Sequence, residues 1–145
     1  MQLTGAVLVL LAGLPAAACA CDVQISTPGL LGLSGDGRTL SSANGLPAIA
    51  VISDLNLLAP TTITISGIRL DQAPGGFAAP LTYAGSYVAN ATLLGTSSGT
   101  IAPSASFQVP AILNLVVTLT IHNSVTSTSG FPQGPYTMKT SVTCT

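Results

Sequence analysis

The strongest constraint on the fold is a long alternation of apolar and polar residues near the C-terminus. Every second position from Leu113 to Ile121 is apolar, and polar residues occupy most of the positions between them. An alternation with a period of two places the apolar set on one face of a β-strand. A loop at residues 126–135 follows, and a second alternating run extends from Tyr136 to Cys144. The sequence therefore predicts a closing β-hairpin whose two strands each bury one face.

The three cysteines further restrict which folds the chain can adopt. Cys21 is in phase with Val23 and Ile25, and Cys144 is in phase with the inward row of the last run. Two inward cysteines at opposite ends of an exported β domain predict a disulfide between the first and last strands, with two unpaired thiols as the alternative. A metal site is not predicted, because Cys19-Ala-Cys21 lacks the spacing and the further ligands of a zinc site.

The N-terminal segment has the pattern of a signal peptide. Residues 6–14 are apolar but too short to span a bilayer, which takes about 20 residues. A proline and a cluster of small residues follow, so the sequence predicts a signal peptide at residues 1–20 and a mature domain at 21–145, with no transmembrane span. No basic residue precedes the apolar run, which leaves an upstream start or an ordinary buried strand as alternatives. A lipid anchor at Cys19 is a further alternative.

The composition excludes several classes of function. The chain has three Lys and Arg against four Asp and Glu, and only 5% of its residues are charged. Nucleic-acid binding needs a basic stripe, and attachment to anionic lipid needs a basic patch, so neither is predicted. A surface with so little charge instead packs readily against copies of itself.

The rest of the mature chain is read as strands and turns. Residues 41–47 and 95–103 are expected to be loops, and a β-bulge is expected at Gly67, where the apolar phase changes face. Several short runs with turn signals between them predict an all-β, immunoglobulin-like β-sandwich of about seven or eight strands. Besides the closing pair, the expected strands are residues 21–27, 30–33, 48–55, 61–70, 81–94 and 105–109.

No catalytic or cofactor site is predicted. Residues 95–99 match the pattern Gly-x-Ser-x-Gly around Ser97, but that motif works only in a turn from strand to helix, and no helical pattern follows. The single histidine, His122, falls on the polar face of its strand. The aspartates are scattered, so no carboxylate pair is available for acid–base chemistry. The chain is therefore not expected to be an enzyme.

Both ends of the mature chain resemble a known family. The resemblance rests on four short motifs. They are Leu119-x-Ile121-His122-Asn123, the end of the loop and the start of the last strand at residues 130–137, the final Val142-Thr143-Cys144, and Cys21-Asp22-Val23 after the signal segment. This arrangement resembles exported bacterial pilin-like domains, namely spore coat protein U-like and related fimbrial subunits of chaperone–usher systems.

The resemblance implies an immunoglobulin-like sandwich that lacks its final strand. The open groove of such subunits is filled by a strand from a periplasmic chaperone or from another pilin-like subunit, which is β-strand addition. A polymerising subunit carries a donor segment ahead of its first strand, whereas the predicted mature chain begins at Cys21, which fits a capping or isolated subunit. The candidate groove walls are Leu113, Leu115, Val117, Leu119, Ile121, Tyr136, Met138 and Val142.

Two functions follow as expectations. The first is an exported structural subunit, without catalysis, of a bacterial surface appendage or coat that serves cell adhesion. The alternative is a self-contained periplasmic or lipid-anchored β-sandwich binding module. In both, the protein lies in the periplasm or at the cell surface.

Overall fold

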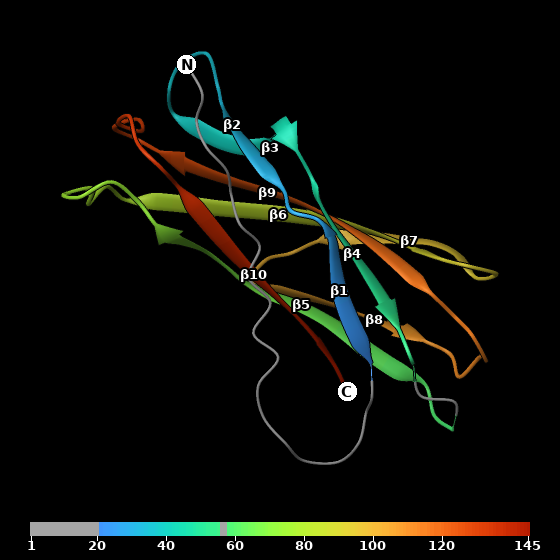
Figure 1. Ribbon diagram of the computed structural model, residues 1–145. Coiled ribbons are helices and arrows are strands. Elements are labelled where there is room, and N and C mark those ends of the chain that lie inside the picture. Colours follow the sequence, from blue (N-terminus) through green and yellow to red (C-terminus); the bar gives the residue numbers. More distant parts are fainter. Residues whose placement is uncertain (1–20, 56–57) are drawn as a thin grey trace.

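The computed structural model describes residues 21–55 and 58–145, which form ten β-strands (Figure 1). The predicted signal peptide, with Cys19, lies outside the described residues. In chain order the strands are β1 (Asp22–Thr27), β2 (Leu30–Leu33), β3 (Thr39–Leu46), β4 (Ala48–Ser53), β5 (Thr61–Gln72), β6 (Leu81–Ala91), β7 (Gly95–Thr100), β8 (Ser104–Val109), β9 (Val117–Ser127) and β10 (Thr137–Cys144).

The strands form two antiparallel sheets that pack face to face, which confirms the predicted all-β sandwich. In the first sheet β9 is central. It pairs with β6 on one side and with β4 and β3 on the other; β7 lies outside β6, β1 outside β4 and β2 outside β3. The second sheet has the order β10-β5-β8. The order β1-β4-β9-β6, with β5 and β10 opposite, follows the A-B-E-D and C-F arrangement of an immunoglobulin-like sandwich.

The predicted closing hairpin is wrong. Both alternating runs form strands, but β9 pairs with β4 and β6 whereas β10 pairs with β5 in the other sheet. The chain between Ser127 and Thr137 crosses from one sheet to the other, so the two inward rows face each other across the core. The apolar row of β9 also begins later than predicted. Asn114 adopts a left-handed φ of 58°, and Leu113 before it is 67% exposed, so the inward row begins at Leu115.

Two segments predicted as loops form strands instead. β3 covers most of residues 41–47, and β7 covers the first part of residues 95–103. β7 is built from Gly, Ser and Thr and pairs with β6 from Ala91 opposite Gly95 to Ser86 opposite Thr100. Backbone pairing with a neighbour stabilises such a strand without burying side chains, so no apolar alternation marks it in the sequence.

The core lies between the inward rows of β9 and β10. Val117, Leu119 and Ile121 are buried from the first sheet, and Met138 and Val142 are buried from the second. Full burial of one such side chain contributes about 1.5–3 kcal/mol. The bulge predicted in β5 is confirmed: the register moves from Lys139–Arg69 to Ser141–Ser66, and Gly67 has a φ of 70° that favours glycine.

The predicted disulfide is confirmed. Cys21 and Cys144 are bonded across a sequence separation of 123 residues, with their Cα atoms 6.3 Å apart. The bond joins the start of the first strand to the end of the last one, and these belong to different sheets. Ile25 departs from the predicted inward phase: it is exposed, directly before a register shift in β1. Within residues 21–55 and 58–145 there is no helix long and apolar enough to cross a membrane.

Candidate strand-binding edge

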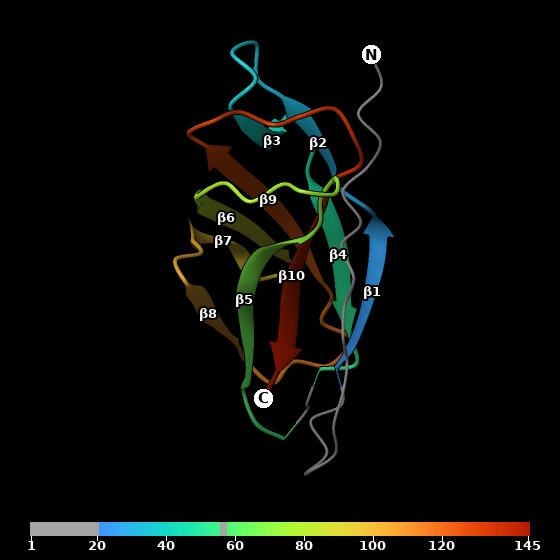
Figure 2. The same cartoon turned by 90° about the vertical axis from the view of Figure 1, so that its left-hand side faces the viewer.

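β10 is an edge strand with one side unpaired among the described residues. It pairs with β5 on one side, and no described strand pairs along the other (Figure 2). In the immunoglobulin-like arrangement, the strand after F occupies this position. An edge of this kind presents unpaired N–H and C=O groups that serve as a template for another strand.

The hydrogen bonds show which peptide groups face outward. The Thr62 N–H donates to the Thr145 carbonyl at 2.7 Å and the Thr145 N–H donates to the Thr62 carbonyl at 2.9 Å. This mutual pair sets the alternation of the antiparallel ladder. Thr143 and Ser141 therefore turn their peptide groups toward β5. The peptide groups of the alternate residues face the unpaired side, and these are Thr140, Val142 and Cys144.

A seam separates this edge from the edge of the other sheet. β1 and β2 form that opposite edge, since each pairs with a single strand. The Cys21–Cys144 disulfide closes one end of the seam. The seam is the space between β10 and the edges of β1 and β2 that have no partner strand among the described residues.

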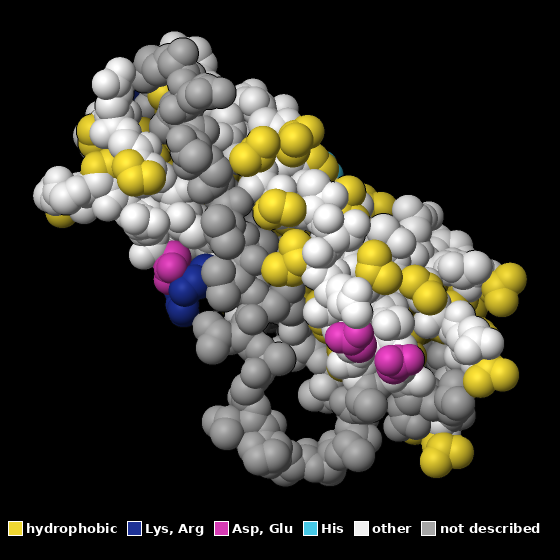
Figure 3. Space-filling model, viewed as in Figure 1, with side chains coloured by type: hydrophobic (Ala, Val, Ile, Leu, Met, Phe, Trp, Pro, Cys, Tyr) yellow, Lys and Arg dark blue, Asp and Glu magenta, His cyan; other side chains and the backbone are white. Residues whose placement is uncertain are grey.

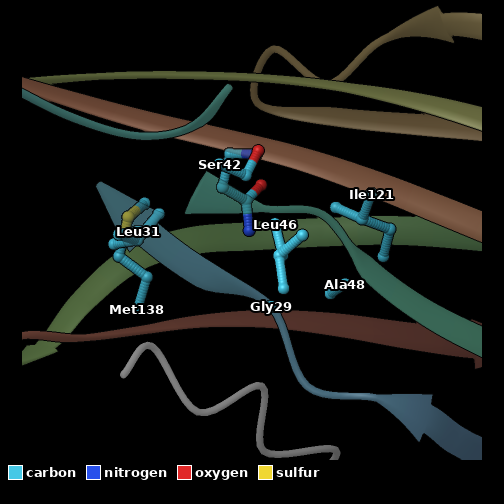
Figure 4. Close-up of a pocket in the computed structure, with 8 residues that line it drawn as sticks. Gly29, Leu31, Ser42, Leu46, Ala48, Ile121 and Met138 are labelled. Carbon is cyan, nitrogen blue, oxygen red and sulfur yellow. The ribbon is translucent and has the colours of Figure 1, made fainter. Parts of the chain in front are cut away.

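Side chains fill the interior of the seam almost completely. A cavity of about 20 Å³ lies where the segment joining β1 to β2 approaches β10 (Figure 4). That volume holds about one water molecule or a small group. Leu31 and Met138 are buried beside it, whereas Leu46 is half-exposed. The residues around the cavity are Gly29, Leu31, Ser42, Leu46, Ala48, Ile121, Asn123 and Met138.

A buried polar link holds the two sheets together beside this cavity. Asn123 Nδ2 donates to Thr140 Oγ1 at 2.8 Å, and the Asn123 backbone N–H donates to Ser42 Oγ at 3.2 Å. Asn123 Oδ1 is buried without a hydrogen-bond partner among the described residues. A buried carbonyl without a donor is costly, so the fixed position of this side chain depends on the bond to Thr140.

The predicted wall residues do not all reach the seam. Ile121 and Met138 line its cavity. Tyr136 is buried in a second cluster, where its hydroxyl donates to the Pro132 carbonyl at 2.7 Å and burial raises the pKa of the phenol. Leu113 lies outside β9 on the surface. The remaining predicted residues are in the core behind the seam, and they are Leu115, Val117, Leu119 and Val142.

Sequence reasoning missed the residues that face β10 from the other sheet. Gly29 lies in the segment before β2, Leu31 lies in β2 and Leu46 ends β3. Residues 30–33 were expected to form an edge strand, but no pattern in the sequence places that strand beside the last one. The pairing order of the sheets, rather than the local sequence, brings these groups together.

The register also separates the residues that a hydrolase would need. Ser97 lies opposite Ala89 on β6, whereas His122 lies opposite Ser86, three positions further along the same strand. In the described part of the chain, no three His, Cys, Asp or Glu side chains gather in a group that could hold a metal ion.

Charged side chains lie away from the seam interior. Lys139 Nζ contacts Asp71 Oδ2 at 2.8 Å on the partly exposed surface. In the turn after β2, hydrogen bonds from the Ser34 hydroxyl and the Arg38 backbone N–H lower the pKa of Asp36.

Comparison of the chain with protein-family models, curated proteins and solved structures finds no match.

Proposed function

We propose that the protein is an exported structural subunit of a surface appendage or coat, joined to its neighbours by a β-strand added along the outer edge of β10. The observation that carries this proposal is the row of outward-facing peptide groups at Thr140, Val142 and Cys144. In β-strand addition, main-chain hydrogen bonds of this kind supply affinity, and alternate side chains supply register.

The seam restricts how such a strand would bind. The disulfide at Cys144 blocks one end, so the strand would extend along β10 from the opposite end, near Thr137. The cavity beside Leu31 and Met138 accepts one small side chain, and any larger one would displace Leu46 or the β1–β2 segment. The added strand is therefore expected to carry a small residue at the position that faces this cavity.

The partner would be an extended strand with alternating apolar residues. A strand from a periplasmic chaperone and a segment of a second pilin-like subunit both have this chemistry. The resemblance of residues 119–123, 130–137 and 142–144 to spore coat U-like and fimbrial subunits supports this class of partner, and with it a role in cell adhesion. The disulfide is compatible with the oxidising compartment of an exported protein.

A second candidate is a self-contained β-sandwich binding module in the periplasm or on a lipid anchor. The observation in its favour is the filled seam, because the cavity is only about 20 Å³ and Met138 is 2% exposed. A core this complete can fold without a further strand.

Size-exclusion chromatography and thermal unfolding of the exported chain would distinguish the two candidates. Strand addition predicts that an alternating peptide with one small apolar residue binds the protein and raises its melting temperature. The control is the same peptide N-methylated at the positions that pair with β10, which keeps its side chains but removes its donors. Equal effects of both peptides, or a monomer whose cooperative unfolding neither peptide changes, would favour the self-contained module.

A further inference from the structure

One end of the sandwich exposes a group of apolar side chains. Leu93 and Leu94 form the turn between β6 and β7, and Leu113 and Val116 lie in the connection between β8 and β9. The two connections touch, because the Thr92 N–H donates to the Val116 carbonyl at 3.2 Å. Figure 3 shows hydrophobic side chains projecting at this end of the molecule. These four residues are called the leucine tip.

The backbone of the leucine tip is unfavourable for leucine. Leu93 has a φ of 79°, in the left-handed region that glycine and asparagine adopt more easily, and its side chain is 85% exposed. A leucine at this position adds nothing to the core and strains the turn. Strained residues that persist in a fold are found mainly at contact and functional sites.

The charges are distributed unevenly between the two ends. Asp22 lies opposite Ser53 at the start of β1, and Asp54 lies beside Leu113, so both are at the end with the leucine tip. The other five of the seven charged side chains lie elsewhere in the chain. They are Arg38, Arg69 and Lys139 with Asp36 and Asp71, for a net charge of +1. The tip end thus carries two negative side chains and no Lys or Arg.

A hollow lies at the opposite end of the sandwich. It has a volume of about 720 Å³ and lies between the β5–β6 connection and the β9–β10 connection. Its lining carries no charge, and the rings of Phe77 and Phe131 stack within it with centroids 5.5 Å apart. Arg38 and Asp36 flank it through Gly37. The two connections and the β6–β7 turn lie at opposite ends of the molecule in Figure 1. This space is called the loop hollow.

We propose that the leucine tip of one copy of this chain binds in the loop hollow of the next copy. The apolar side chains of the tip would pack on the rings of Phe77 and Phe131 in the uncharged lining, and the negative end of one copy would meet the more positive end of another. The contact joins two different surfaces at opposite ends of the molecule, so copies add head to tail. It uses neither β10 nor the seam, and therefore does not depend on the proposed strand addition.

Two variants of the exported chain test the contact. Leu93→Asn with Leu94→Ser removes the tip and leaves the hollow, whereas Ala78→Glu places a charge at an exposed position of the hollow and leaves the tip. Sedimentation velocity of the wild type should show a concentration-dependent series of oligomers. Each variant alone should associate at least about tenfold more weakly. Leu30→Ser, at an exposed position outside both surfaces, is the matched control and should behave like the wild type.

Mixing the two variants gives the decisive result. The mixture contains one intact tip and one intact hollow per pair, so the proposal predicts dimers and nothing larger. A mixture that stays monomeric would overturn the proposal, and so would a wild-type chain that stays monomeric at the highest attainable concentration. Association of the hollow variant through its tips would show a symmetric contact instead. Binding of the wild type but not the tip variant to phosphatidylcholine vesicles, without self-association, would show a membrane-facing tip.

The outcome is independent of the strand-peptide experiment. A peptide that stabilises the chain while the mixed variants fail to pair would retain strand addition and exclude the head-to-tail contact. If the mixed variants pair but the peptide has no effect on the chain, strand addition is excluded and the head-to-tail contact is retained. Circular dichroism of both variants checks that neither substitution has unfolded the sandwich.

Discussion

Asn123 and Thr140 join the two sheets through a hydrogen bond inside the core. Asn123 Nδ2 donates to Thr140 Oγ1 at 2.8 Å, and Thr140 is fully buried. This bond explains why a threonine interrupts the apolar row of β10. It also places a polar connection directly behind the strand edge that we propose as the binding site.

Thr140→Val should destabilise the protein although the two side chains have nearly the same shape. The substitution leaves the Asn123 amide without its acceptor, and an unsatisfied buried group costs about 1–3 kcal/mol. Urea denaturation would measure the free energy of unfolding. In a double-mutant cycle with Asn123→Leu, the second substitution should cost less when Thr140 has already been replaced. Strictly additive effects would contradict a direct interaction.

Loss of the disulfide should weaken the fold substantially. Replacing Cys21 and Cys144 by serine frees the loop of 123 residues and should reduce the free energy of unfolding by about 2–5 kcal/mol. Thermal unfolding with and without a reducing agent measures the effect. The reducing agent should lower the melting temperature of the wild type and leave that of the double-serine variant unchanged.

Leu93→Asn should stabilise the isolated chain. Asparagine adopts a φ near 79° with less strain than leucine, so we expect a gain of about 0.5–1 kcal/mol. Leu94→Asn, next to it but without a positive φ, should change stability by less than about 0.5 kcal/mol. Denaturant unfolding of the three proteins would decide this, and an equal response of the two variants would argue against strain at Leu93.

Tyr136 should make stability depend on alkaline pH. Burial raises the pKa of its phenol in the folded state, so the unfolded chain ionises first. The stability present below about pH 10 should therefore fall as the pH rises through the folded pKa. Tyr136→Phe loses the hydrogen bond to Pro132, at a cost of about 1 kcal/mol near neutral pH, and should remove this residue's part of the alkaline loss. Melting temperatures of both proteins between pH 7 and 11 would show the difference.

The sequence predicted which side chains are buried better than it predicted which strands pair with each other. The alternation in the last two runs identified Val117, Leu119 and Met138 as inward-facing, because a period of two directly reports which face is buried. It could not show that β9 and β10 lie in different sheets, since the same alternation fits a hairpin or a crossing between sheets. β7 was missed because Gly, Ser and Thr carry no apolar signal.

The candidate site was predictable only in part. Cys144 and the inward row were identified from phase and position along the chain. The free edge of β10 was expected from the family resemblance, whereas its outward peptide groups follow from the pairing with β5. Leu31 and Leu46 were missed, because their approach to β10 depends on how β2 and β3 pack in three dimensions.

Residue-level amide hydrogen exchange of β10 tests the central claim most directly. In the isolated exported chain, the outward amides of Thr140, Val142 and Cys144 should exchange faster than the amides of Ser141, Thr143 and Thr145, which face β5. When the strand peptide or a natural partner binds, the three outward amides should become protected while the three inward ones change little. Outward amides that are already protected in the monomer, or that stay unprotected in the assembled form, would contradict strand addition at this edge.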